Sequence, residues 1–159
     1  MDPVFVKYLH ILSSTLLFGT GIGSAFYLLV TSLTRDVHAV ASVARLVVIA
    51  DWLFTATTVV IQPLTGFYLA HRLGVHWTTP WLYWSLVLYA IAVGCWLPVV
   101  WLQMRLRDIA RAAAGDGVAL PPRYAAHLGA WAALGVPAFF CFLLVFYMMV
   151  AKRVPWLET

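Results

Sequence analysis

Four long apolar stretches constrain the fold of this chain more than any other feature. They run over residues 4–30, 47–70, 81–104 and 128–151. A helix needs about 20 apolar residues to cross a hydrocarbon core roughly 30 Å thick. The chain is also only 10% charged, whereas soluble domains carry about 25% charged residues. We therefore predict an all-α polytopic membrane protein, in which residues 1–159 form a single four-transmembrane-helix bundle embedded in the lipid bilayer.

Two features of the chain that suggest processing or cross-linking have simpler interpretations. The first apolar stretch has no basic leader after Met1-Asp2-Pro3 and is longer than the apolar core of a signal peptide, so we expect a helix of the mature protein. Cys95 and Cys141 both fall within predicted spans. We expect buried free thiols there, and no disulfide or cysteine-based metal motif.

The arginines are concentrated in two of the three connections between the predicted spans. Arg35 and Arg45 flank the first connection, and the others of this group lie in the third: Arg105, Arg107, Arg111 and Arg123. Basic residues favour the cytoplasmic side of a membrane. We therefore expect a protein of the bacterial inner membrane with both termini outside. A nucleic-acid partner is not expected, because the arginines lie next to the membrane.

The two connections that carry arginines predict different structures. The first, "TSLTRDVHAVASVAR", is polar enough for a loop or a short interfacial helix. In the third connection, "AAAGDG" followed by Pro121-Pro122 predicts a helix end and a rigid turn. Several tryptophans near the predicted span ends, Trp96 among them, are typical of an aromatic belt.

His10 is an ionisable residue on the opening turns of an apolar helix. At 3.6 residues per turn it shares a face with Ser14 and Gly21. A histidine beside such small residues suits a flat macrocycle such as haem, whose iron takes a neutral imidazole nitrogen. The alternative is an interhelical hydrogen bond, which histidine also makes in membranes. From this residue alone the two interpretations are equally good.

A second iron ligand is expected from the end of the second span, which returns to the same side of the membrane. "GFYLAHR" places His71 there, with Met148 or Met149 of the fourth span as a fallback. Arg72 or Lys7 would meet the haem propionates in the headgroup zone. His38 and His127 belong to the opposite side of the membrane and cannot share a site with His10.

A polar stripe follows the second span at helical spacing. It consists of Asp51, Thr55, Thr58, Gln62 and Gly66, and such a stripe should face the bundle interior. His71 falls roughly opposite the stripe on an ideal helix, although Pro63 disturbs the helix between them. In one interpretation the stripe holds neighbouring helices together by hydrogen bonds, with Asp51 near Arg45 or Arg105. In the other it is a proton or quinol path. We favour the structural interpretation.

Gly19 and Gly23 form a G-x-x-x-G pair on the first span, on the side away from His10. Such pairs allow close helix packing or self-association in membranes. A homo-oligomer is therefore an expectation. The motif is common in apolar helices, so its specificity is low.

Longer segments of the chain resemble known membrane proteins. "KYLHILSSTLLFGTGIGSAFY", "ADWLFTATTVVIQPLTGFYL" and "LPPRY" resemble a family of bacterial predicted integral membrane proteins of unknown function, over nearly the whole chain. The K-x-x-H first helix is also similar to HemJ-type protoporphyrinogen IX oxidases and to copper-resistance D-type membrane proteins. The HemJ resemblance implies a small helical protein that binds haem b through an essential first-helix histidine, carried here by Lys7 and His10.

Two classes of function follow from these observations. The first is a b-type haem-binding protein that moves electrons between quinone or a porphyrin and another acceptor, with a HemJ-like oxidoreductase as its specific form. The second is a cofactor-free membrane protein that acts as a copper or small-solute transport component or as an assembly partner. The four methionines and two cysteines make a poor copper path.

Overall fold

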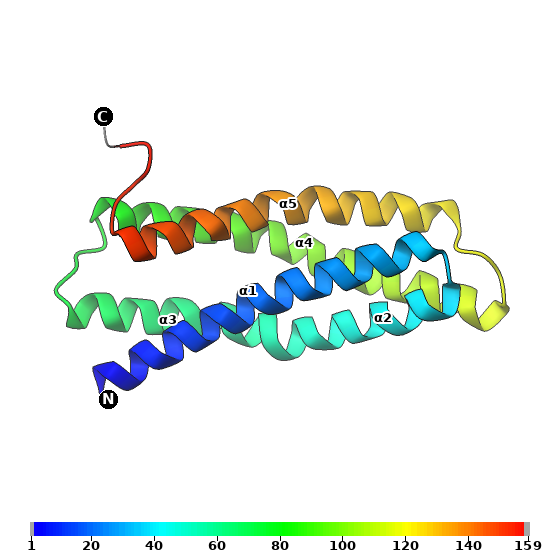
Figure 1. Cartoon of the computed structure of the whole chain (residues 1–159), viewed down its shortest axis with the longest axis horizontal. Coiled ribbons are helices and arrows are strands. Elements are labelled where there is room, and N and C mark those ends of the chain that lie inside the picture. Colours follow the sequence, from blue (N-terminus) through cyan, green and yellow to red (C-terminus); the bar gives the residue numbers. More distant parts are fainter. Residues whose placement is uncertain (1, 158–159) are drawn as a thin grey trace.

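A computed structural model describes residues 2–157 of the chain, and these residues form a bundle of long helices (Figure 1). Its elements are α1 (Pro3–Thr34), α2 (Val37–Ala50), the short π-helix η1 (Asp51–Thr55), α3 (Ala56–Arg72), α4 (Pro80–Asp116) and α5 (Pro122–Ala151). Because α2, η1 and α3 run on as one helix, Val37–Arg72, there are four helices long and apolar enough to cross a membrane. This confirms the prediction of an all-α, four-helix membrane protein.

The helix formed by α2, η1 and α3 begins well before its apolar stretch. The Asp36 side chain caps α2 by accepting from the backbone N–H groups of His38 and Ala39. Val40, Ala44 and Val47, spaced about one turn apart, are buried in the core. The prediction of a loop or interfacial helix in this connection was therefore wrong, because its small apolar residues fall on one helical face that packs inside the bundle.

A short loop, residues 117–121, joins α4 to α5. Gly117 ends α4 in the left-handed conformation, with a φ of 63°, which glycine adopts without steric cost. Pro122 is the first residue of α5, a position where the missing N–H of proline costs nothing. The helix end predicted from "AAAGDG" is confirmed, and the rigidity expected from Pro121-Pro122 stays a prediction.

The two ends of the bundle carry different segments. Both described termini and the α3–α4 connection lie at one end, hereafter the terminal end, and the α1–α2 turn and the α4–α5 connection lie at the other (Figure 1). This second end is hereafter the arginine end, because it carries Arg35, Arg45, Arg105, Arg107, Arg111 and Arg123. The relative placement of the connections expected from the sequence is therefore correct.

The helices pack in two pairs that meet mainly in the arginine half. The backbones of α1 and α3 approach each other closely, as do those of α4 and α5, and α2 packs against α4. The main apolar cluster lies in the arginine half; it includes Leu28, Val40, Leu106, Ala110 and Trp131. In the terminal half, by contrast, α3 packs chiefly on α1, and this is where His10 lies.

Candidate functional site

His10 is half-buried in α1 and bonds to α3. Its Nδ1 lies 2.8 Å from the hydroxyl oxygen of Thr65. The Thr65 hydroxyl also lies 2.8 Å from the carbonyl oxygen of Ile61 and 3.1 Å from that of Gln62, both in its own helix. When the hydroxyl donates to one of these carbonyls, its oxygen accepts from the imidazole and Nδ1 carries the ring proton. This tautomer leaves the Nε2 lone pair of His10 available to a ligand.

The His10 imidazole packs against Gly66 of α3. A Cβ atom built at Gly66 would lie only 3.2 Å from Cε1 of His10, which is tighter than ordinary van der Waals contact. The ring thus rests against the bare backbone of Gly66 and is oriented by the Thr65 hydroxyl. Sequence reasoning placed Gly66 on the polar stripe but missed Thr65, although Thr65 is three residues beyond Gln62 and so on the same side of the helix.

A second polar contact joins α1 to α3 one turn deeper in the membrane. The Ser13 hydroxyl donates to the side-chain carbonyl of Gln62 in a short hydrogen bond. We call the two contacts, His10–Thr65 and Ser13–Gln62, the polar seam. Further along the same helix Thr58, Thr55 and Asp51 are buried. The prediction that the polar stripe faces the bundle interior is confirmed, and α1 is the helix it meets at this end.

Asp51 ends the stripe deep inside the bundle and does not pair with an arginine. Only 3% of the residue is exposed, and its carboxylate accepts from the indole N–H of Trp96 at 3.2 Å. Within residues 2–157 the sole ion pair joins Arg107 to Asp108. The expected proximity to Arg45 or Arg105 was therefore wrong, because the α2–α4 register brings an indole opposite the carboxylate. Trp96 was expected in the aromatic belt and instead bonds within the bundle.

The π-helix η1 begins at this same aspartate. Its five residues, Asp51–Thr55, lie between two ordinary α-helical segments. Single π-turns inside α-helices are rare and occur frequently at functional sites. The polar stripe thus runs from a π-turn with a buried carboxylate to the His10 imidazole near the terminal end.

The face of α1 that carries His10 is open only in part: Leu17 is buried, Ser14 is half-buried and Gly21 is exposed. The Ser14 hydroxyl donates to the Ile11 carbonyl of its own helix at 2.7 Å. Gly21 is exposed, and a Cβ atom there would meet nothing within 4 Å. A Cβ atom would also meet nothing at Gly19 and Gly23, on the side of α1 away from His10. The expected roles of Ser14 and Gly21 at a macrocycle, and of Gly19 and Gly23 in self-association, stay predictions.

The predicted second ligand, His71, lies beyond Gly66 on α3, and its role as a ligand stays a prediction. His71 is exposed in the last turn of α3, five residues beyond Gly66, which is about 8 Å along the axis and about 140° around it. The fallback residue Met148 is fully buried in α5, and Met149 is half-buried.

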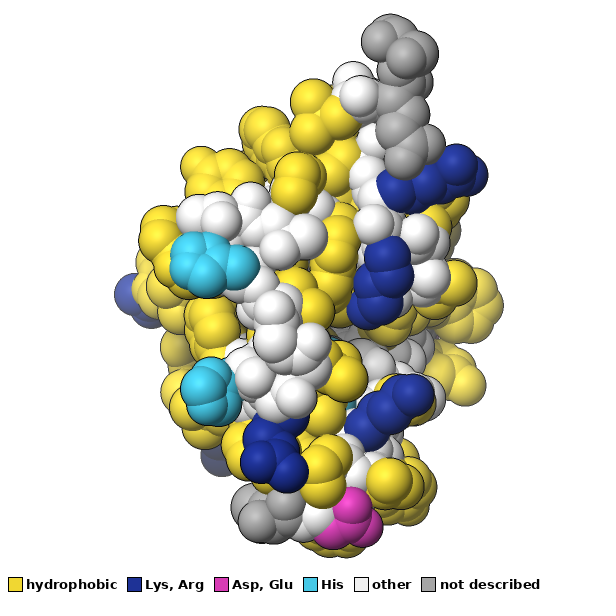
Figure 2. Space-filling view, turned by 90° about the vertical axis from the view of Figure 1, so that its left-hand side faces the viewer, with side chains coloured by type: hydrophobic (Ala, Val, Ile, Leu, Met, Phe, Trp, Pro, Cys, Tyr) yellow, Lys and Arg dark blue, Asp and Glu magenta, His cyan; other side chains and the backbone are white. Residues whose placement is uncertain are grey.

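Positive charge gathers at the terminal end, where Figure 2 shows Lys and Arg side chains with few acidic ones. Lys7 and Arg72 are exposed there. Just beyond α5, burial lowers the pKa of Lys152, and the charge of Lys7 lowers it further. The Lys152 ammonium lies 4.1 Å from the centre of the Trp81 ring, in a cation–π contact. The same end thus holds cations that could meet anionic groups of a ligand.

The fold and this site define a polytopic four-helix membrane protein with a polar seam between its first two spans. Residues 4–153 match the model of the family described as "Predicted integral membrane protein (DUF2269)". The chain belongs to this family, as the resemblance of its long segments predicted. No curated protein and no solved structure matches it, so the similarity of the first helix to HemJ-type oxidases stays a prediction.

Proposed function

We propose that this protein binds haem b and has a redox role in the bacterial inner membrane, with His10 as an axial ligand. The observation that carries the proposal is the contact between His10 and α3. Nδ1 lies 2.8 Å from the Thr65 hydroxyl oxygen, so Nε2 is the nitrogen proposed to bind iron. Metal-bound histidines commonly donate their other N–H in this way, which fixes the ring and raises its basicity.

The residues around His10 fit one side of a haem. Thr65 and the bare backbone of Gly66 contact the imidazole ring, and the exposed Gly21, where a Cβ atom meets nothing within 4 Å, leaves room for a flat group. When bound, haem b supplies one-electron transfer within the membrane. Lys7 and Arg72 would bind its propionates by charge-assisted hydrogen bonds. A HemJ-like oxidoreductase acting on quinone or porphyrin is the specific form of the proposal.

The orientation that accompanies this proposal places the arginine end in the cytoplasm. Six arginines lie at that end, and the terminal end carries Lys7, Arg72, Lys152 and Arg153. The positive-inside rule then puts both termini outside. His10, about ten residues into the chain, would lie near the outer surface of the membrane.

The absorption spectrum of protein purified in detergent from haem-replete cells tests the proposal. We expect a Soret band and the pyridine haemochrome of non-covalent haem b, since the chain has no C-x-x-C-H attachment motif. His71→Ala and Met148→Leu then identify the second ligand, because its loss converts six-coordinate iron to five-coordinate iron. A colourless protein that takes up no added haem would refute the proposal.

The competing candidate is a cofactor-free protein, a copper or small-solute transport component or an assembly partner. The observation in its favour is that His10 and Ser13 bond side by side to α3, as residues that only hold two helices together would do. In that case His10 binds no iron, and the spectrum of the purified protein has no Soret band.

A further inference from the structure

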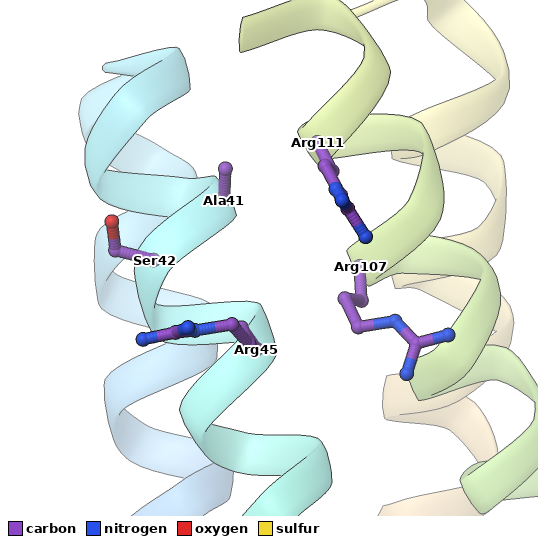
Figure 3. Close-up of a pocket in the computed structure, with 5 residues that line it drawn as sticks. All are labelled: Ala41, Ser42, Arg45, Arg107 and Arg111. Carbon is purple, nitrogen blue, oxygen red and sulfur yellow. The ribbon is translucent and has the colours of Figure 1, made fainter. Parts of the chain in front are cut away.

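A pocket of about 530 Å³ lies between α2 and α4 at the arginine end. Figure 3 shows its lining: Ala41, Ser42 and Arg45 from α2, and Arg107 and Arg111 from α4. This volume lies within the range of roughly 300–1,000 Å³ that is typical of small-molecule sites. Three of the five lining residues are arginines, so the chemistry of the lining favours an anionic ligand.

The charge of the pocket is only partly balanced by the protein. Arg107 donates to the Asp108 carboxylate from Nε and from Nη2, each at 2.8 Å. Arg45 and Arg111 are exposed and form no ion pair within the part of the chain that the structure describes. Asp36, the nearby acid of α2, is engaged by backbone N–H groups of that helix. Two guanidinium groups therefore remain for a ligand, and their planar donor geometry suits phosphate.

The pocket lies at the depth of lipid headgroups. Arg45 comes just before the apolar stretch 47–70, while Arg107 and Arg111 follow the apolar stretch 81–104. Ile49 and Leu53 follow Arg45 at four-residue steps, so they continue its helical face into the membrane, and both are exposed. The acyl chains of a phospholipid whose phosphate is bound by the arginines would therefore lie along these apolar side chains.

We infer that this pocket binds the phosphate group of an anionic phospholipid between α2 and α4, with Arg45 and Arg111 as its principal partners. Basic pockets between transmembrane helices on the cytoplasmic side recognise such headgroups. The inference is independent of the haem proposal, because the pocket lies at the opposite end of the bundle from His10. Bound lipid would link α2 to α4.

Native mass spectrometry of the full-length protein in detergent tests this inference with phosphatidylglycerol as the probe. We expect bound phosphatidylglycerol that phosphatidylcholine does not replace and that millimolar inorganic phosphate does not displace. Arg45→Gln with Arg111→Gln should weaken binding roughly 30-fold, at about fivefold for each arginine lost near a membrane surface. Arg123→Gln, at the same end but outside the pocket, is the matched control and should bind as the parent does.

Three results would overturn the inference. Unchanged phosphatidylglycerol binding by the double variant would mean that Arg45 and Arg111 do not bind the lipid. Equal retention of phosphatidylcholine would mean that the surface selects no headgroup charge. Displacement of the lipid by inorganic phosphate would make the pocket a site for free phosphate. The last two tests use the unaltered protein, so they hold even if the double variant does not fold.

Discussion

The two halves of the bundle are held together by different interactions. In the arginine half, buried apolar side chains from α1, α2, α4 and α5 form one cluster. In the terminal half, α1 meets α3 through the polar seam, His10–Thr65 and Ser13–Gln62. Within lipid, close packing contributes most to helix association, and a single interhelical hydrogen bond averages only about 0.6 kcal/mol. The apolar cluster of the arginine half therefore contributes most to the stability of the bundle, and the polar seam of the terminal half contributes less.

The largest stability loss should come from the apolar cluster. Leu106 is fully buried in it, so Leu106→Ala should lower the free energy of unfolding by about 2–5 kcal/mol, through lost contacts and the remaining cavity. Unfolding in mixed detergent measures this loss. Leu97→Ala on the same helix is the control, because Leu97 is 61% exposed and should change stability by less than about 0.5 kcal/mol. Equal losses would mean that the apolar cluster does not contribute most to the stability of the bundle.

A substitution at Gly66 should act on both stability and the site. The two methyl groups of Gly66→Val would enter space occupied by the His10 ring, which should cost about 1–3 kcal/mol of unfolding free energy and break the bond to Thr65. Gly94→Val is the control, since a Cβ atom at Gly94 meets nothing within 4 Å. Thermal unfolding and haem content report the two effects. A Gly66→Val protein with unchanged haem content would contradict the described position of the ring.

The smallest effect is expected at Ser13. Ser13→Ala leaves the Gln62 side-chain carbonyl without its donor, and should cost about 0.6 kcal/mol. Ser24→Ala removes a hydroxyl that bonds only to the Gly21 carbonyl of its own helix, so its stability should stay near that of the parent. Unfolding in mixed detergent again gives both values. If Ser13→Ala matched Leu106→Ala, polar contacts and not apolar packing would dominate this bundle.

The fold could be predicted from the sequence much further than the contacts of the site. Lipid allows few structures, so four apolar stretches and their arginines determined the helix number and the relative topology. Helix ends were missed where apolar residues such as Val40 and Ala44 lie outside the hydrophobic stretch but still pack inside the bundle.

The partners of individual polar residues depend on helix register and rotation, which hydropathy does not encode. Trp96 opposite Asp51 and Thr65 opposite His10 are both contacts of this kind. Gly66 was recognised as part of the polar stripe, but its contact with the imidazole follows only from how closely α1 approaches α3. The sequence therefore indicated His10 as a candidate functional residue but did not identify the α3 residues that orient its ring.

The haem content of His10→Ala tests the central claim most directly. His10→Ala removes Nε2, the nitrogen proposed to bind iron, while the apolar cluster of the arginine half is untouched, so the protein should still fold. We expect the purified variant to lose its haem or to change spin state in the Soret region. His38→Ala, an exposed position at the opposite end, should keep the parental spectrum. A parental spectrum in His10→Ala would contradict the account and leave the imidazole as a contact between two helices.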